Sequence, residues 1–400
     1  MDMDRFFTQN YQEAGQAMST HVYYVPSINI MGKGCLQEIG PFIQELQLKK
    51  ALVVTDKFLV SSGIAGKLLA VLDAANVEYV VYDEVKPNPT CKNVHDGVDF
   101  LKAHNCDYLI SIGGGSPQDT AKAIGIIATN GGHIAEYEGV HKSKHKSLPI
   151  VAVNTTAGTS SEVTINYVIT DEERKVKMVM VDKNSIATIS VNDPELMVDK
   201  PAALTAATGM DALTHAIEAL VTPGAYPVTD ATALAAVELI FGNLARTVKN
   251  GHDIEAREQM VYAIFLGGLA FNNAGLGYVH AMAHQLGGVY DLPHGVCNAM
   301  LLPIVEEENA KYVPEKFRSI AKVIGFDVLG KSDKECADFV IESIKALSKE
   351  VGIPSKLSEL GVNEVDLDLL AENSMKDACA PGNPFIPTKE EAIAMFKKIL

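Results

Sequence analysis

The sequence predicts an α/β domain with a parallel sheet, followed by a domain built almost entirely of helices. Two observations support this prediction. As far as about residue 170, short β-branched or aliphatic runs alternate with amphipathic segments, which is typical of parallel strands covered by helices. After residues 192–194 (NDP), long stretches rich in Ala, Leu, Met and Glu have helix periodicity and few strand-like runs. We therefore expect an N-terminal extension over residues 1–22, an α/β domain over 23–195 and a helical domain over 196–400.

The elements of the first domain follow from short runs in chain order. Residues 64–75 and 93–104 have the pattern of amphipathic helices. A β-rich segment over residues 163–190 is expected to finish the sheet. The expected strands of the sheet are residues 51–55 (ALVVT), 78–82 (EYVVY), 108–112 (YLISI) and 150–154 (IVAVN).

The composition excludes several classes of protein. Of 400 residues, 47% are hydrophobic and 21% charged, which is ordinary for a soluble globular protein. The net charge of −16 argues against nucleic acid or an anionic membrane as a partner, because either requires clustered Lys and Arg. No apolar run approaches the roughly 20 residues of a membrane span, and the acidic start does not resemble a secretory signal. A cytoplasmic location is expected, with the six cysteines reduced.

Three glycines follow the third expected strand. Gly113, Gly114 and Gly115 lead into Ser116-Pro-Gln-Asp119, where a helix is expected to begin. Glycines allow a diphosphate to approach the backbone, and the free N–H groups of a helix N-terminus favour its negative charge. The run is not the G-x-G-x-x-G fingerprint, and tight packing alone is the alternative explanation.

Two further features of this half are compatible with a nucleotide. Asp56 ends the first expected strand, where an acid accepts a hydrogen bond from a ribose 2′-hydroxyl and repels a 2′-phosphate, which favours NAD over NADP. An N-cap role for Asp56 is equally compatible with the sequence. Residues 154–162 (NTTAGTSSE) supply hydroxyl groups that suit phosphate or nicotinamide contacts, although an ordinary capped turn has the same composition.

Three of the eleven histidines lie in one Gly-punctuated apolar stretch, residues 271–300. His280 and His284 are four residues apart, so that on a helix both imidazoles leave the same face, about 6 Å apart at Cβ. The pair Gly287-Gly288 is expected to end that helix, and a turn then lets His294 point back at the same space. A lone histidine is more often a core or surface residue, but three in such a stretch favour a reactive site.

Asp211 and His215 are also four residues apart, within residues 209–218 (GMDALTHAIE). On a helix they share a face and can chelate a divalent cation, whereas an Asp near a helix start is usually a cap. With His280 and His294 they make a set of one oxygen and three nitrogens, which suits Zn²⁺ or Fe²⁺ better than Ca²⁺ or Mg²⁺. A substrate alcohol that binds such a cation loses its proton more easily, which promotes hydride departure. The cleft between the two domains is the expected place for this site.

Taken together, these motifs resemble the iron-containing (group III) alcohol dehydrogenases. The resemblance rests on residues 113–119, 154–162, 206–218 and 277–295 and covers nearly all of 23–400. It is closest to microbial NAD-dependent methanol, ethanol and 1,3-propanediol dehydrogenases. It implies a Rossmann-like N-terminal domain, an all-α C-terminal domain of the dehydroquinate synthase-like type, and reversible hydride transfer between short primary alcohols and NAD to give aldehydes. Homo-oligomers, either dimers or assemblies of dimers, are implied as well.

The resemblance also implies roles for individual residues. His284 matches an additional histidine near the metal and nicotinamide that helps to move the proton. Phe271 matches a residue lining the substrate pocket, and Cys379 lies in a stretch near the site in relatives. The metal, Fe²⁺ with Zn²⁺ as the alternative, is placed on Asp211, His215, His280 and His294. The positions that match NAD contacts are Asp56, Asn88, Gly113, Gly114, Gly115, Ser116, Asp119, Thr155, Thr156, Thr159 and Lys177.

Two departures from the family pattern concern the substrate. Gln118 stands where many methanol- and propanediol-type relatives have His, and residues 380–385 (APGNPF) differ from the Asn-Pro-Arg-Lys type common there. The alternative functions are a dehydroquinate synthase-type lyase, a glycerol dehydrogenase-type enzyme and a non-catalytic metal-binding assembly protein. The lyase needs a strongly basic pocket, whereas Ala, Met, Leu, Gly and Phe surround the expected ligands in sequence, which favours a small uncharged substrate.

Overall fold

A computed structural model of the protein describes residues 20–400, which form two compact units. One unit comprises Tyr24–Val198, and the other comprises Asp199–Leu400 together with the described residues that precede Tyr24. The expected N-terminal extension lies outside the described residues except for residues 20–22, which are neither helix nor strand. The break between the units at Val198 falls close to the boundary expected from the change in composition.

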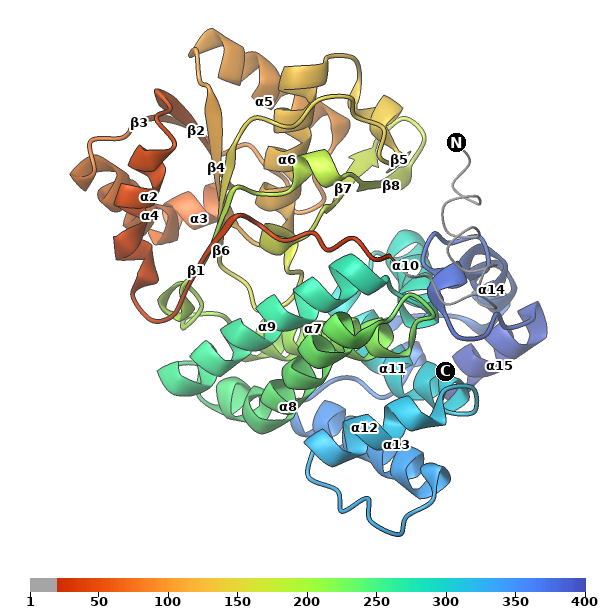
Figure 1. The fold of residues 1–400 in the computed structure, drawn as a ribbon. Helices are drawn as coiled ribbons and strands as arrows, with labels where there is room; N and C mark the ends of the chain where they lie inside the picture. The colour runs from red at the N-terminus through yellow and green to blue at the C-terminus, as the bar shows by residue number, and fades with distance from the viewer. Residues whose placement is uncertain (1–19) are drawn as a thin grey trace. The chain divides into compact units, whose positions relative to one another are not determined.

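A six-stranded sheet forms the core of the unit Tyr24–Val198 (Figure 1). Every pair of neighbouring strands is parallel, and the burial of nearly every residue of the inner strands is typical of a sheet covered on both faces. All four strands expected from the sequence are present. The strands in spatial order are β1 (Ile28–Met31), β9 (Ile189–Asn192), β6 (Ile150–Asn154), β4 (Tyr108–Gly113), β2 (Lys50–Val54) and β3 (Glu78–Tyr82).

Helices cover both faces of this sheet. Because successive side chains of a strand point to opposite faces, Leu52 packs into the apolar cluster that contains Val98 and Ile124, whereas Val53 packs into the one that contains Ile39 and Leu68. The parallel α/β class predicted for this half, with its Rossmann-like arrangement, is confirmed. The helices are α2 (Ile39–Glu45), α3 (Lys57–Ser61), α4 (Ile64–Ala74), α5 (Cys91–Ala103) and α6 (Gly115–Asn130).

A second, three-stranded sheet corrects one expectation. Strands β7 (Asn166–Asp171) and β8 (Val176–Val181) pair antiparallel, and β5 (Gly139–Val140) adds to β8. The expectation that residues 163–190 finish the main sheet is therefore wrong for β7 and β8, and only β9 joins it. The physical reason is visible in β7, where buried residues alternate with partly exposed ones, because this small sheet is buried on one face only.

The second unit is helical, as predicted, and its described residues contain no strand. Helix α7 is buried along nearly its whole length and packs against α8, α9 and α11, so it carries any polar side chain into the core of the unit. The helices are α7 (Ala202–Val221), α8 (Pro227–Lys249), α9 (Ile254–Ala274), α10 (Tyr278–Tyr290), α11 (His294–Asn309), α12 (Pro314–Val323), α13 (Asp333–Glu350), α14 (Leu367–Ser374) and α15 (Lys389–Lys398).

Helix α8 is, by length and composition, apolar enough to cross a membrane, and α9 and α10 pass the same test together as a bent pair. This is weak evidence for a membrane span, because the core helix of a soluble protein passes the same test. In this structure α8 packs against α7 and α9.

Candidate functional site

Three of the predicted metal ligands converge inside the helical unit. Asp211 and His215 lie half-way along α7, His280 lies on α10, and one ligand atom from each lies within 4.8 Å of the others. All three side chains are buried, and the rings of His215 and His280 stack with centroids 4.9 Å apart. Asp211 is far from the start of its helix, so the capping role does not apply. A buried carboxylate beside two imidazoles is a donor set that suits a first-row divalent cation.

His294, the fourth predicted ligand, meets the same carboxylate from the first turn of α11. Its Nε2 lies 3.5 Å from Asp211 Oδ1, and its side chain is 43% exposed. The next residue, Gly295, allows this approach, since a Cβ there would lie 2.4 Å from the carbonyl oxygen of Ala207 on α7. The start of α11 therefore packs directly on α7, which brings His294 to Asp211.

The end of α10 differs from the sequence prediction. The helix continues through Gly287 and Gly288 to Tyr290, so the expectation that the glycine pair ends it is wrong. The helix ends instead at Asp291, which adopts the left-handed conformation with φ of 53° and donates its backbone N–H to the Gly287 carbonyl. The reason is that glycine permits a left-handed turn without requiring it, while Asp tolerates the same conformation.

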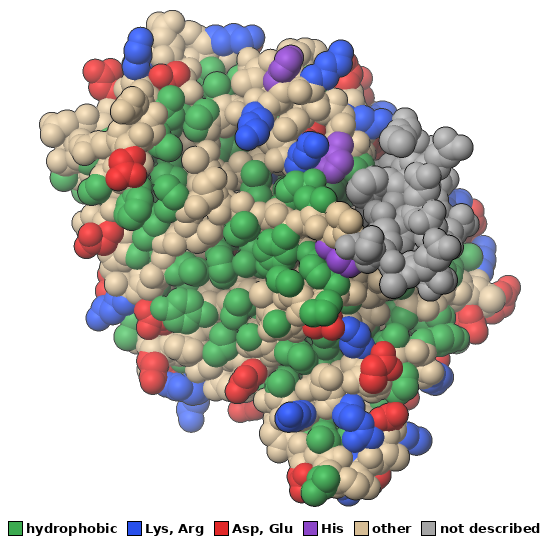
Figure 2. Space-filling view, in the orientation of Figure 1, with side chains coloured by type: hydrophobic (Ala, Val, Ile, Leu, Met, Phe, Trp, Pro, Cys, Tyr) green, Lys and Arg blue, Asp and Glu red, His purple; other side chains and the backbone are tan. Residues whose placement is uncertain are grey.

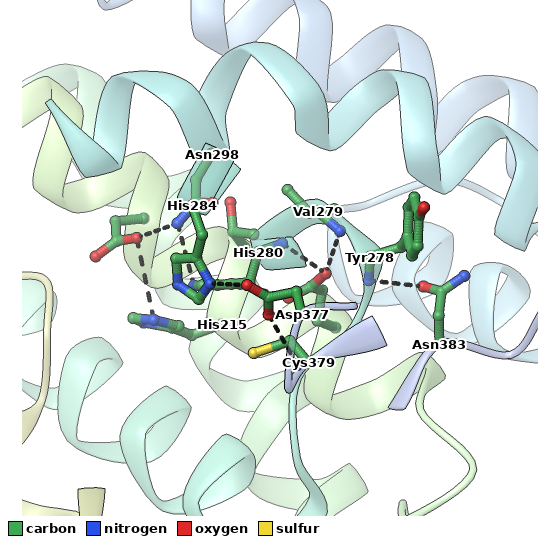
Figure 3. Close-up of polar contacts among 12 residues, drawn as sticks. His215, Tyr278, Val279, His280, His284, Asn298, Asp377, Cys379 and Asn383 are labelled. Atoms are coloured by element: carbon green, nitrogen blue, oxygen red, sulfur yellow. Dashed lines mark hydrogen bonds and ion pairs between the residues drawn. The ribbon is translucent and has the colours of Figure 1, made fainter. Parts of the chain in front are cut away.

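His284 lies one turn after His280 on α10 and contacts a carboxylate from a distant part of the chain (Figure 3). Its Nδ1 lies 3.0 Å from Asp377 Oδ2, and its ring stacks on that of His294 with centroids 5.5 Å apart. Burial raises the pKa of Asp377, but the charge and hydrogen bond of His284 together with the backbone N–H of Cys379 lower it on balance. Asp377 is thus ionised and accepts the Nδ1 hydrogen, so that in the neutral form of His284 the Nε2 atom is the acceptor.

Both predicted pocket residues lie beside these histidines. The ring of Phe271, on α9, stacks on His215 with centroids 4.3 Å apart. The Sγ atom of Cys379 lies within 4.8 Å of the ligand atoms of His284 and Asp377. Burial raises the pKa of the Cys379 thiol well above its ordinary value, and the negative charges of Asp377 and Glu218 add to this effect. The thiol is therefore protonated at neutral pH.

Glu218 is a residue whose role the sequence analysis missed. Its Oε2 lies 2.5 Å from Nδ1 of His280, and its Oε1 accepts the backbone N–H of Val279 at 2.7 Å. Burial opposes the protonated form of His280, but Glu218 raises the pKa of His280 on balance. This contact leaves Nε2 of His280 for a metal, as carboxylates behind metal-binding histidines do. The signal in the sequence was the seven-residue spacing from Asp211, which places Glu218 on the same face of α7.

Asn298 provides a test of whether the site fits a cation. Its Nδ2 lies 2.7 Å from Asp211 Oδ1, 3.1 Å from His280 Nε2 and 3.0 Å from His294 Nε2. Two amide hydrogens cannot serve three acceptors, so the lone pairs that converge here are better matched by one divalent cation. The residues therefore fit the metal that the motifs predict.

A buried polar network supports the start of α10. Asn383 Oδ1 accepts the backbone N–H of Tyr278, and Asn383 exchanges hydrogen bonds with Asn309, which in turn donates to Glu306. Burial raises the pKa of Glu306 well above its ordinary value, and the charge of Glu218 adds to this effect. The segment 380–385, which departs from the family pattern, is thus a structural support of the helix that carries His280.

In the sheet unit, the glycine turn and the polar cluster that follows β6 contact each other. A Cβ at Gly114 would lie 3.0 Å from Thr156 Cγ2, and one at Gly115 would lie 3.3 Å from Thr159 Cγ2. Tight packing is therefore one reason for these glycines. The turn also leads directly into α6, whose N-terminus begins at Gly115.

Asp119 and Ser116 hold this region together from α6. Asp119 accepts the Ser161 hydroxyl at 2.7 Å and the backbone N–H of Val168 at 2.9 Å, so both of its oxygens are engaged within the protein. The hydroxyl of Ser116 donates to the carbonyl of Pro87. These contacts are structural, and no role as a cofactor contact follows from them.

Lys122, which the sequence analysis also missed, is fully buried beneath the same loop. Its ammonium group donates to Ser161 Oγ at 3.1 Å and to the carbonyl oxygens of Thr164 and Asn166 at 2.8 and 2.7 Å. Burial lowers the pKa of Lys122 to about 8, against the charges of Asp119 and Glu162. Lys122 therefore fixes the loop after β6 to helix α6.

The remaining predicted cofactor residues occupy varied positions. Asp56 is the N-cap of α3 and accepts the Leu59 backbone N–H at 2.8 Å, which is the alternative role named for it. Thr155 is buried. Asn88 and Lys177 are exposed. They lie close together in the fold, because the carbonyl of Pro89, the residue after Asn88, accepts the backbone N–H of Thr170, and Thr170 pairs with Lys177 between β7 and β8.

Gln118, the other departure from the family pattern, is buried at the start of α6. Its Oε1 accepts the Ser111 hydroxyl at 3.1 Å, and its Nε2 lies 3.4 Å from the Gly113 carbonyl. Within the sheet unit the side chain thus ties the turn to β4.

Comparisons with known proteins cover nearly the whole chain. Residues 26–194 match the sequence family described as iron-containing alcohol dehydrogenase, and residues 205–400 match the C-terminal part of the Fe-containing alcohol dehydrogenase family. The chain is 48% identical to alcohol dehydrogenase 4 of Schizosaccharomyces pombe, over 97% of this chain and 91% of that one. It is 46% identical to the NAD-dependent methanol dehydrogenase of Bacillus methanolicus, over 94% of this chain and 99% of that one.

A solved structure has the same fold. The crystal structure of a 1,3-propanediol oxidoreductase superposes with a TM-score of 0.93, at 48% sequence identity, over 95% of this chain and all of that one. The predicted fold class, an α/β domain followed by a helical domain, is confirmed by this match.

Proposed function

Because this chain belongs to the iron-containing alcohol dehydrogenase family, we propose that it oxidises short primary alcohols to aldehydes with NAD and catalyses the reverse reduction. Membership implies an oxidoreductase that uses a divalent metal and NAD(H). The substrate class rests on relatives named as a methanol dehydrogenase and a 1,3-propanediol dehydrogenase. The observation that carries the proposal is the convergence of Asp211, His215 and His280 with His294 at the same carboxylate.

Asp211, His215, His280 and His294 are the residues that would hold the metal. When bound, a divalent cation would polarise the substrate oxygen and stabilise the negative charge that develops there as the proton leaves. Fe²⁺ is the proposed ion and Zn²⁺ the alternative, since one oxygen and three nitrogens suit both. Glu218 fixes the orientation of His280, and its carboxylate lies behind the ring on the side away from the ligand atoms.

His284 is proposed as the residue that moves the proton. Asp377 binds its Nδ1 hydrogen, so Nε2 can accept a proton from the substrate side. The His284 side chain is 32% exposed, which provides a path to solvent. Phe271 and the neutral thiol of Cys379 form apolar walls nearby, which suits a short uncharged substrate.

The alternative enzyme classes are less well supported. A dehydroquinate synthase-type lyase needs cationic groups for a phosphorylated, carboxylated substrate. Phe271, Glu218 and Asn298 contact the candidate metal ligands, and Asp377 contacts His284; none of these four residues is cationic. A glycerol dehydrogenase-type enzyme differs only in substrate, so activity measured with a panel of alcohols distinguishes it.

For the cofactor, we propose NAD with its diphosphate at the N-terminus of α6, over the turn Gly113–Gly115. Asp56, Asn88, Ser116, Asp119, Thr155, Thr156, Thr159 and Lys177 remain the predicted contacts. Both carboxylate oxygens of Asp119 already accept hydrogen bonds within the protein, so a structural role explains Asp119 more simply than a cofactor contact does.

Association into homo-oligomers, dimers or assemblies of dimers, is also proposed. Only 33% of the most apolar 18-residue stretch of α8 is buried. Figure 2 shows hydrophobic side chains gathered on the face over α8 and α9. An exposed apolar surface of this kind supports contact with a second copy of the chain. The relatives indicate a soluble protein, and we propose the cytoplasm as its compartment.

Elemental analysis of anaerobically purified protein, coupled to a panel of alcohols with NAD and NADP, tests the proposed function. We expect one divalent metal per chain and NADH production with methanol, ethanol, butanol or 1,3-propanediol. The absence of any NADH absorbance change across the panel would contradict the proposal, and activity with glycerol alone would favour the glycerol dehydrogenase type.

A further inference from the structure

A second set of metal-binding side chains lies beside the four predicted ligands. His284 on α10 and two residues that follow α14, Asp377 and Cys379, each offer one ligand atom, and these atoms lie within 4.8 Å of one another. Figure 3 shows the side chains of His284, Asp377 and Cys379 grouped together. An imidazole, a carboxylate and a thiol are the three kinds of ligand that zinc takes from proteins.

The three side chains are held in place without any metal. His284 Nδ1 lies 3.0 Å from Asp377 Oδ2, and the other oxygen of Asp377 accepts the backbone N–H of Cys379 at 2.9 Å. The backbone carbonyl of Asp377 also accepts the N–H of Ala380, which closes the turn. The side chains of His284 and Asp377 are 32% and 13% exposed, so a cation can reach them from solvent without unfolding of the turn.

We propose that His284, Asp377 and Cys379 form a second, inhibitory site for thiophilic divalent cations such as Zn²⁺ and Co²⁺. On binding, the Sγ–H bond of Cys379 breaks, its proton goes to solvent, and a bond from Sγ to the cation forms. Nothing is oxidised or reduced. An imidazole nitrogen and an Asp377 oxygen complete three protein ligands, and water takes the fourth position. The thiolate selects zinc-like cations over Mg²⁺ and Ca²⁺.

The inhibition follows from His284 and rests on the proposed function. A cation at this site draws His284 and Asp377 into its own coordination, so the hydrogen bond that prepares His284 to move a proton is lost. It also adds positive charge close to His294, whose ring stacks on that of His284. Zn²⁺ beyond the first equivalent should therefore inhibit alcohol oxidation, while the first cation stays bound.

Cobalt distinguishes the two sites, because only the second contains sulfur. In an anaerobic Co²⁺ titration of the metal-free full chain, a thiolate-to-cobalt charge-transfer band in the near ultraviolet reports on Cys379. We expect two bound equivalents and this band in the wild type, and one equivalent and no band in Cys379→Ala and Asp377→Asn. Cys91→Ala, which removes a partly buried thiol in the sheet unit, is the matched control and should retain two bound equivalents and the charge-transfer band.

A single equivalent without a band in the wild type would overturn the proposal, and so would a band that survives in Cys379→Ala. Alkylation of Cys379 by iodoacetamide, mapped by mass spectrometry, tests the wild type directly and does not depend on the folding of a variant. Excess Zn²⁺ over one equivalent should slow this alkylation, and an unchanged rate would count against the site.

Two activity measurements separate the second site from the proposed function. If the second equivalent of Zn²⁺ binds but leaves NADH production unchanged, the inhibitory role is wrong. If the protein shows two equivalents and the cobalt band but no NADH production with any alcohol, the second site stands and the proposed function fails.

Discussion

Glu218 Oε2 lies 2.5 Å from Nδ1 of His280, although 62 residues of chain separate the two. Glu218 comes from α7, the helix that also carries Asp211 and His215, so one helix supplies two candidate ligands and the carboxylate that orients a third. Both side chains are buried. The contact fixes the ring of His280 with Nε2 toward Asn298 and Asp211, the place where the candidate ligands converge.

Glu218→Gln should weaken metal binding by roughly 10- to 100-fold, the usual effect of removing a carboxylate behind a metal-binding histidine. Glutamine keeps the size of the side chain but loses the charge that holds the Nδ1 hydrogen of His280. Competition with a chelator, followed by metal analysis, measures the change. Glu307→Gln, at an exposed residue paired with Lys398, is the matched control. Equal metal affinity in wild type and Glu218→Gln would refute this role.

Asp377→Asn should lower kcat by roughly 10- to 100-fold, part of the 10²–10⁴-fold that a general acid–base group contributes, while KM changes little. The amide no longer favours the tautomer of His284 that carries hydrogen on Nδ1. Steady-state kinetics with one alcohol and NAD measure the effect, and Asp377→Glu should restore part of kcat. Asp291→Asn, at an exposed residue near the end of the same helix as His284, is the control. A change in KM alone would argue for a purely structural role.

Lys122→Met should reduce the free energy of unfolding by about 3 kcal/mol or more, since it leaves several buried acceptors without a donor. The carbonyls of Thr164 and Asn166 would lose the ammonium group that binds them, so the loop after β6 loosens. NAD affinity should fall as well. Urea denaturation and calorimetric titration with NAD measure the two effects. Lys102→Met, on the exposed face of α5, should change neither, and equal stability of Lys122→Met and wild type would contradict the prediction.

The raised pKa of the buried Glu162 predicts that the protein loses stability as the pH rises. Burial raises its pKa from 4.5 to about 7, and Asn192 and the charge of Lys122 offset only part of this effect. The pKa of Glu162 is higher in the folded protein than in the unfolded chain. The free energy of unfolding is therefore highest below pH 4.5, where Glu162 is protonated in both states, and it falls as the pH rises through about 7. The shift corresponds to about 3 kcal/mol.

Glu162→Gln should therefore remove this slope and be the more stable protein at pH 8. Urea denaturation of metal-free protein between pH 5 and 8 measures the difference between wild type and variant. Glu173→Gln, on an exposed turn, should follow the wild-type curve. Parallel curves for wild type and Glu162→Gln across the whole range would show that Glu162 remains ionised.

Local patterns in the sequence determined much of the fold and of the candidate site. The runs of β-branched residues predicted the parallel strands, because a strand buried on both faces has a continuous apolar sequence. The spacing of four residues placed Asp211 with His215 and His280 with His284 on single helix faces, since helix geometry alone sets this distance. The order of the motifs also identified the family, which the comparisons confirm.

Only the tertiary structure decided which distant residues meet. It placed Glu218 behind His280, and it placed Asp377 against His284 across 93 residues of chain. In the tertiary structure β7 and β8 also form a separate sheet, and α10 extends past Gly287 and Gly288. The physical reason is that strand periodicity and helix spacing are properties of neighbouring residues, whereas these contacts depend on how whole helices and strands pack. No local sequence pattern predicts how these helices and strands pack.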